Sequence, residues 1–137
     1  MVYKGNNIFI EENKFYNTSY SGIYTGYNYS NNNVFFEDIF IRNNLFENNM
    51  MNLKNGGGIT LFGGYKNGCV EYNTLLGSGI YFGENALGYV IRENSINTDG
   101  TGINMWSELT HDIILSGNDI MSGNDIIKGR NITIINQ

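Results

Sequence analysis

Aromatic, hydroxyl and amide side chains recur at one place along the chain, directly after a repeated Gly-Ile pair. In the four clear copies the residues after the isoleucine are Tyr24, Thr60, Tyr81 and Asn104. Two positions further on, two of the copies carry Phe62 and Trp106. Aromatic rings stack on the C–H faces of sugars, and amides and hydroxyls bind sugar hydroxyl groups. The pattern favours a face that contacts sugar; the alternative is that the rings shield a sheet from water or pack under a loop.

Three carboxylates flank these copies. Glu84 follows the third copy, Asp99 precedes the fourth and Glu108 follows it. Hydrolysis of a glycosidic bond uses two carboxyl groups, about 5 Å apart for retention or about 6.5–9.5 Å apart for inversion. The three acids are therefore candidates for that chemistry. The alternative is that Glu84 and Asp99 are ordinary exposed acids in turns.

Elimination chemistry is a weaker hypothesis. A lyase needs a basic proton acceptor, usually beside calcium-binding acids, and Lys54, Lys66 and Lys128 lie apart from any acidic cluster in the sequence. Calcium takes about six to eight oxygen ligands. One histidine and one cysteine cannot build a zinc site. We therefore expect no metal and no cofactor.

A second repeated unit alternates with the Gly-Ile copies and contains an asparagine. The residues at this position, separated by roughly 20 to 30 positions, are Asn13, Asn44, Asn73, Asn94 and Asn118, with Gln137 as a last, clipped copy. This spacing is typical of a parallel β-helix, in which each coil stacks about 4.8 Å above the one before. We expect an all-β solenoid of about five coils. A sandwich with Gly/Asn turns is disfavoured because sandwich strands do not share one turn motif.

The alternation of apolar residues around the asparagines predicts which side chains face inward. Three inward stacks are expected: Ile10, Ile41, Val70, Ile91, Leu115 and Ile134; Phe15, Phe46, Leu75, Ile96 and Ile120; and Ile23, Ile59, Ile80, Ile103 and Ile126. The asparagine between the first two stacks is expected to turn the chain in a left-handed conformation and to form an amide ladder. The outward residues after the first stack alternate in charge and predict cross-strand ion pairs: Glu11, Arg42, Glu71 and Arg92.

These repeats, over residues 6 to 137, resemble those of the right-handed parallel β-helix proteins of the pectate-lyase-like group. More narrowly, Tyr20-Ser21-Gly22-Ile23, Asn32-Asn33-Val34 and Asn55-Gly56-Gly57-Gly58-Ile59 resemble a group of β-helical glycoside hydrolases. The resemblance implies a right-handed helix, an extracellular or cell-surface location, and a catalytic pair at the positions of Asn55 and Glu84. Because the amide of Asn55 cannot supply a carboxylate, Asp99 or Glu108 would have to take its place.

Length and charge limit the remaining possibilities. The 137 residues form one domain, 1–137, with 24 asparagines, 18 glycines and no proline. The net charge of −5 without a basic stripe argues against nucleic acid, and no apolar run is long enough to predict a membrane span. Two hypotheses remain: a glycoside hydrolase-like protein that binds or cleaves a polysaccharide or oligosaccharide on the Gly-Ile face, or a non-catalytic glycan-binding, adhesin or structural segment. Because the ends of a solenoid expose its core, we also expect further coils in a longer chain or end-to-end self-association.

Overall fold

The regular structure of the chain is β-strand throughout the described residues. The computed structural model describes residues 6–25, 35–49, 57–83 and 86–135. The strands are β1 (Ile8–Glu11), β2 (Lys14–Tyr16), β3 (Ile23–Tyr24), β4 (Phe35–Arg42), β5 (Leu45–Glu47), β6 (Gly57–Leu61), β7 (Gly64–Glu71), β8 (Thr74–Leu76), β9 (Gly79–Phe82), β10 (Leu87–Arg92), β11 (Ser95–Met105), β12 (His111–Ser116), β13 (Asp119–Ile127) and β14 (Arg130–Ile135). No helix long and apolar enough to cross a membrane occurs in this part of the chain.

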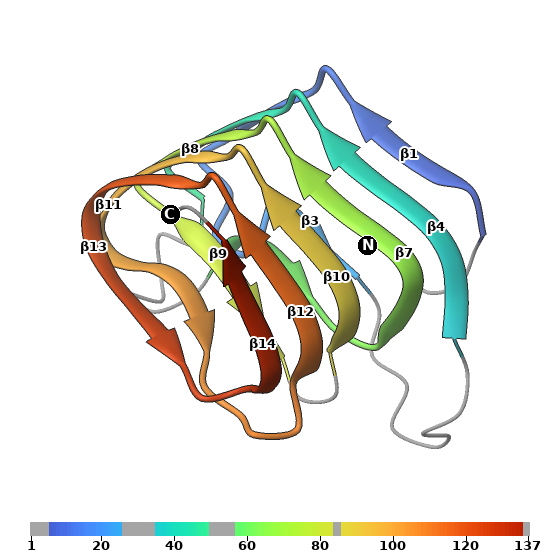
Figure 1. Ribbon diagram of the computed structural model, residues 1–137. Helices are drawn as coiled ribbons and strands as arrows, with labels where there is room; N and C mark the ends of the chain where they lie inside the picture. Colours follow the sequence, from blue (N-terminus) through green and yellow to red (C-terminus); the bar gives the residue numbers. More distant parts are fainter. Residues whose placement is uncertain (1–5, 26–34, 50–56, 84–85, 136–137) are drawn as a thin grey trace.

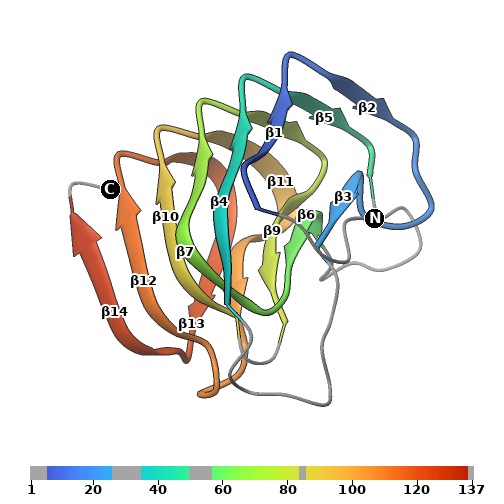
Figure 2. The same cartoon turned by 90° about the vertical axis from the view of Figure 1, so that its right-hand side faces the viewer.

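The strands form two parallel sheets. The first sheet has the order β1-β4-β7-β10-β12-β14, so that every neighbour comes from a later pass of the chain (Figure 1). The second has the order β2-β5-β8-β11-β9-β6-β3, with β13 paired to β11. The long strands β11 and β13 run from one part of the second sheet to the other and bend on the way, so that the sheet is curled (Figure 1). Figure 2 shows the two sheets from the side, with the first sheet in front of β11 and β13. This all-β, parallel and curled arrangement is compatible with a β-helix or solenoid.

The first two predicted inward stacks are present in register. In the first sheet, the pairings place Ile10, Ile41, Val70, Ile91, Leu115 and Ile134 in one row. The four central members of that row are fully buried, whereas Ile134, on the edge strand β14, is 54% exposed. In the second sheet Phe15 pairs with Phe46, and their rings stack with centroids 4.8 Å apart. Like side chains therefore bury one another along the direction in which the strands stack.

The third stack is correct for four isoleucines and wrong for the fifth. Ile23, Ile59, Ile80 and Ile103 align and are buried. Ile126, however, lies opposite Asn104, and Ile127 lies opposite Met105. The register shifts at this point because the Asp125 side chain accepts the backbone N–H of Ile103 at 2.9 Å. Ile127 then packs against the core in place of Ile126.

The predicted asparagine ladder links five asparagines from successive passes of the described chain. The amide Nδ2 of each asparagine donates to Oδ1 of the next, at 3.2, 3.0, 3.0 and 2.9 Å, in the order Asn13, Asn44, Asn73, Asn94 and Asn118. The backbone N–H of each of the first four donates to the same Oδ1 atoms at 2.9–3.2 Å. The buried amides of Asn44, Asn73 and Asn94 are thus bonded to both neighbouring passes of the chain, which satisfies polar groups that lie away from water. The expected sixth member, Gln137, lies outside the described residues.

The sequence predicts that the ladder asparagine itself adopts the left-handed conformation at each of these turns. This prediction is wrong, because the left-handed residue is the one before the asparagine. These residues have φ between 52° and 61° and are Glu12, Asn43, Tyr72, Glu93 and Gly117. A left-handed conformation costs an ordinary residue roughly 1–2 kcal/mol. The turn accepts Glu12 and Tyr72 there because the ladder bonds fix the following residue. The asparagine therefore contributes its side-chain amide to the ladder, and the residue before it makes the turn from the first sheet to the second.

Candidate functional site

The residues after the Gly-Ile isoleucines form one row across the second sheet. Tyr24 pairs with Thr60, Thr60 with Tyr81, and Tyr81 with Asn104. They belong to β3, β6, β9 and β11, which are consecutive neighbours in that sheet. Their alignment follows from the buried isoleucines, because side chains alternate between the two faces of a strand. We call the face that carries these residues the Gly-Ile face.

Two members of this row are buried. Thr60 and Asn104 are only 4% and 5% exposed, whereas Tyr24 and Tyr81 are half-buried. The hydroxyl of Thr60 lies 2.5 Å from the hydroxyl of Ser21, from the segment that leads into β3. Thr60 therefore serves the packing of this face, and the two tyrosines present more of their surface to water.

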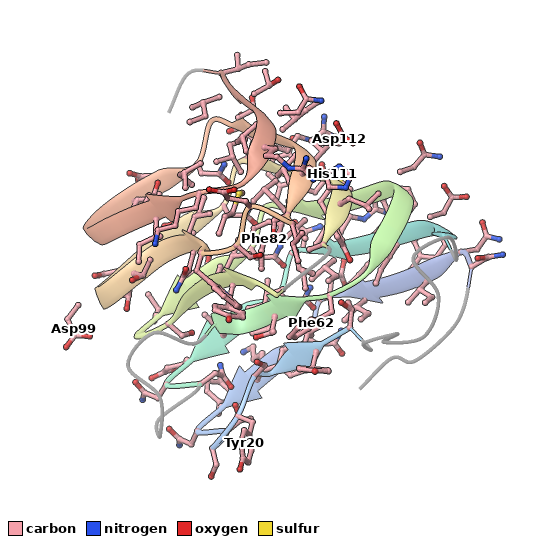
Figure 3. The ribbon with its side chains drawn as sticks, turned by 90° about the horizontal axis from the view of Figure 1, so that it is seen from below. Tyr20, Phe62, Phe82, Asp99, His111 and Asp112 are labelled. Carbon is pink, nitrogen blue, oxygen red and sulfur yellow. The ribbon has the colours of Figure 1, made fainter. Side chains whose placement is uncertain are left out.

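Phe62 packs across the next strand. Phe62, Gly83 and Trp106 directly follow the ends of β6, β9 and β11. A Cβ atom placed on Gly83 would lie 1.9 Å from the Phe62 ring, so glycine is required under that ring. The ring of Tyr24 lies on the other side, 5.1 Å from that of Phe62 and tilted by 42°. The structure thus brings Tyr24 and Phe62 together, with the Phe62 ring over the end of β9 (Figure 3).

The main chain of Phe62 is fixed by hydroxyl groups. Its N–H donates to the buried Thr25 hydroxyl at 2.7 Å, and its carbonyl accepts from the same hydroxyl at 3.0 Å. The phenol of Tyr89 donates to this carbonyl at 3.3 Å. Phe62 is therefore held in place at both its backbone and its ring, and the aromatic pair is a preformed surface.

Trp106 is the most exposed ring of the predicted sugar-contacting residues that the structure describes. It is 41% exposed, at the start of the turn between β11 and β12. The turn is closed by a bond from the Thr110 N–H to the Ser107 carbonyl, 3.1 Å, and by one from the Leu109 N–H to the Ser107 hydroxyl, 3.2 Å. The buried Thr110 hydroxyl also donates to the carbonyl of Gly83 at 3.1 Å. The turn that carries Trp106 is therefore attached to the strand end under Phe62.

The candidate acids are dispersed or lie outside the described part of the chain. Asp99 is an exposed residue within β11, not in a turn, and it projects from the margin of the molecule well away from Phe62 (Figure 3). Glu108 is exposed in the Trp106 turn. Asn55 and Glu84 are outside the described residues, so the separation of that pair stays a prediction.

Glycines of the Gly-Ile motif have a packing role. A Cβ on Gly22 would lie 2.9 Å from the Phe46 ring, and one on Gly58 would lie 2.5 Å from the Ser78 hydroxyl. On Gly57 it would lie 2.3 Å from the carbonyl oxygen of Ile59. Real Cβ atoms do not approach this closely, so close packing alone explains these glycines. The motif therefore adds no independent support for catalysis.

The charged residues of the first sheet form the expected ion pairs. Arg42 lies 2.6 Å from Glu11, and Arg92 lies 2.6 Å from Glu71, whose side chain is almost fully buried. Arg42 reaches Glu71 only at 3.9 Å. Cys69 lies beside this network, and burial, followed by the Glu71 carboxylate, raises the pKa of its thiol to about 11. A thiol with so high a pKa is unreactive at neutral pH.

Two further acidic sites were not identified from the sequence. Asp112 accepts hydrogen bonds from Asn131 and lies 2.7 Å from His111 Nδ1, and these contacts, with that of Asn131 the larger, lower the pKa of its carboxyl (Figure 3). Partial desolvation raises the pKa of Asp125, and the bond from the Ile103 N–H opposes the rise. A His-Asp doublet in the sequence was the only signal for the first site, and nothing marked the second.

No metal site is formed by the described residues, because they contain no group of three or more His, Cys, Asp or Glu side chains that could hold an ion. No protein-family model matches the chain, and no curated protein or solved structure matches it either. The chemical arguments for function therefore come from the arrangement of these residues.

Proposed function

We propose that the chain is a right-handed parallel β-helix of about five coils that binds a polysaccharide or oligosaccharide on its Gly-Ile face. The observation that carries the proposal is the exposed Trp106 ring, which directly follows a strand of the Gly-Ile face, together with the Tyr24–Phe62 ring pair. Aromatic rings with a polar edge bind sugars by stacking and by hydrogen bonds at the same time. Half-buried Tyr81 lies between the pair and the β11 strand that leads to Trp106.

Binding is favoured over cleavage by the described acids. Asp99 lies away from the aromatic pair, and two carboxyl groups across one bond are required for hydrolysis. Cleavage would depend on Glu84 together with Asn55, or on Asp99 or Glu108 as the second acid. If Glu84 and residue 55 do form the pair, Asn55→Asp should raise any hydrolytic activity and Glu84→Gln should abolish it.

The experiment is a glycan-array screen, followed by titration of each hit and a reducing-sugar assay on the same sample. We expect binding without release of reducing ends. Trp106→Ala should weaken binding about tenfold, because a stacked ring contributes on the order of 1 kcal/mol beyond its buried area. Tyr16→Ala is the matched control: Tyr16 is 46% exposed but belongs to β2, which carries no residue of the Gly-Ile face.

Three results distinguish the alternatives. Equal loss in Trp106→Ala and Tyr16→Ala would remove the Gly-Ile face from the binding site. Release of reducing ends by the unmodified chain, lost in Glu84→Gln, would establish a hydrolase. A chain that binds no glycan would refute the proposal and leave a structural segment as the function.

We extend the proposal to a further layer packed on β14, either additional coils or a second copy. Ile134 belongs to a row whose central members are fully buried, yet it is 54% exposed, and Ile135 is 46% exposed. An edge strand with exposed isoleucines is a template for another strand. Ile134→Lys should reduce any self-association measured by sedimentation equilibrium; unchanged association would rule out this edge.

A further inference from the structure

The turn that carries Trp106 lies under the connection between β13 and β14. The N–H of Lys128 donates to the carbonyl of Met105 at 2.7 Å, immediately before Trp106. The N–H of Arg130 donates to the carbonyl of Thr110 at 2.8 Å, at the other end of the turn. Residues 106–110 are therefore held at both ends by the following pass of the chain.

The Arg130 side chain reaches the middle of the same turn. Its Nε donates to the carbonyl oxygen of Glu108 at 2.8 Å. A guanidinium is charged at all ordinary pH values and its N–H groups lie in one plane, so this charge-assisted bond restrains the direction from which the carbonyl is approached. Glu108 is only two residues from Trp106, and the bond therefore limits the movement of the ring's own turn.

Arg130 differs from the other described arginines in how its charge is used. Arg42 and Arg92 form ion pairs with glutamates of neighbouring strands. Arg130 forms no ion pair within the described ranges, and its side-chain bond goes to the backbone of the Trp106 turn. Its charge is also the last of the causes that lower the pKa of the Asp112 carboxyl, after the contacts of Asn131 and His111. The distinctive contact of Arg130 is thus one that supports a turn.

We propose that Arg130 is a positioning residue for glycan binding, which acts by holding the Trp106 turn through the Glu108 carbonyl. The role of Arg130 in glycan binding rests on the proposed function, whereas its effect on the position of Trp106 does not. Arg130 need not touch the sugar. Removing the Arg130 side chain leaves Trp106 in the protein but allows its ring to change orientation, so the binding surface loses its preformed shape.

Trp106 is the only tryptophan of the chain, so intrinsic fluorescence reports on this ring alone. We would compare Arg130→Met, Arg130→Gln and Lys128→Met, well below their melting temperatures, by fluorescence anisotropy and by acrylamide quenching. Arg130→Met removes every donor, whereas the amide nitrogen of Arg130→Gln stands where Nε stood and can still donate to the Glu108 carbonyl. Lys128→Met is the matched control: it also removes one exposed positive charge, and the Lys128 backbone bond to Met105 remains. Affinity for a glycan hit would be measured calorimetrically on the same samples.

We expect Arg130→Met to lower the anisotropy of Trp106, increase its quenching and weaken glycan binding about threefold to tenfold, the range for the net contribution of one hydrogen bond. Arg130→Gln, which can still donate to the Glu108 carbonyl, should restore part of both signals. Lys128→Met should change neither. In a Trp106→Ala background, Arg130→Met should weaken binding no further.

Two results would overturn the inference. Unchanged Trp106 anisotropy and quenching in Arg130→Met would show that the side chain does not hold the turn. Equal effects of Lys128→Met and Arg130→Met on binding would show a general effect of charge. If the unmodified chain binds no glycan, the proposed function fails, whereas the fluorescence comparison still decides whether Arg130 holds Trp106.

Discussion

Replacing Asn73 by alanine tests whether the asparagine ladder holds the coils together. Asn73 is 1% exposed and forms side-chain bonds to both neighbouring passes of the chain. Its Oδ1 accepts the backbone N–H and the Nδ2 of Asn44, both at 3.0 Å. Its Nδ2 donates to the Ile41 carbonyl at 2.8 Å and to Asn94 Oδ1 at 3.0 Å. Alanine removes all of these bonds at once.

The magnitude follows from the groups left without a partner. The Asn44 amide nitrogen keeps its bonds to the carbonyls of Ile10 and Arg42, so it remains satisfied. The backbone N–H of Asn44 and the carbonyl of Ile41 lose the side-chain partners described above. A buried polar group without a partner costs about 1–3 kcal/mol. We therefore expect Asn73→Ala to lower the free energy of unfolding by about 3–5 kcal/mol, a large part of the roughly 5–15 kcal/mol of a typical domain.

The assay is urea unfolding followed by circular dichroism, with the slope m checked for each variant. Asn13→Ala is the control, because Asn13 is exposed and its side chain donates only to Asn44 and to the Glu11 carbonyl. It should cost less than about 1 kcal/mol. Asn94→Ala, with bonds of the same kind, should match Asn73→Ala. If Asn73→Ala proved no more costly than Asn13→Ala, the ladder would be a consequence of the fold and not a cause of its stability.

Three other changes test separate features. Arg42→Glu places a third acid between Glu11 and Glu71 and should lower the free energy of unfolding by about 1–2 kcal/mol. Because Glu71 pairs more closely with Arg92 than with Arg42, recovery of stability requires that all four charges be exchanged, in the variant Glu11→Arg, Arg42→Glu, Glu71→Arg and Arg92→Glu. A fourfold variant that melts no higher than the single variant would contradict the pairing. Asp125→Asn should stabilise the fold at pH 7, because the raised folded-state pKa of Asp125 means that its ionisation opposes folding. The difference in unfolding free energy between variant and parent should therefore shrink as the pH falls toward the ordinary carboxyl pKa, and a difference that grew would reverse the assigned shift. Cys69 should react with a thiol reagent at pH 8 only after unfolding, since a pKa of about 11 leaves roughly one thiolate in a thousand; rapid reaction of the native chain would show that the thiol is accessible.

Much of the fold was predictable because the repeat is one-dimensional. Once the asparagines of successive passes are aligned, every neighbouring residue can be assigned to the inner or the outer face, because side chains alternate along a strand. The rows that contain Ile41 and Phe46 follow from this assignment. The charge row was predictable for the same reason. These features depend only on residues that occupy the same place in successive passes, and they require no knowledge of distant loops.

The remaining features depend on local competition between contacts. The sequence does not show that Tyr72 adopts a left-handed conformation, because the ladder bonds of Asn73 outweigh the intrinsic preference of tyrosine. It also does not show that Asp125 replaces a backbone partner and moves Ile126 out of the core row. In both cases a side-chain hydrogen bond outweighs the intrinsic preference or the alternation of faces on which the sequence-based prediction depends.

The Gly-Ile face shows the same limit, and the difference matters for function. Its rows were predictable, but the ring of Phe62 lies on Gly83, and the Tyr24 ring lies against Phe62. Part of the aromatic surface is thereby used to cover the sheet, and Trp106 is left as the most exposed ring among the predicted sugar-contacting residues that the structure describes. One such ring contributes on the order of 1 kcal/mol beyond its buried area. Under the proposed function, affinity for a single sugar unit should therefore be low, and a polymer whose repeated units contact several sites at once should bind more tightly.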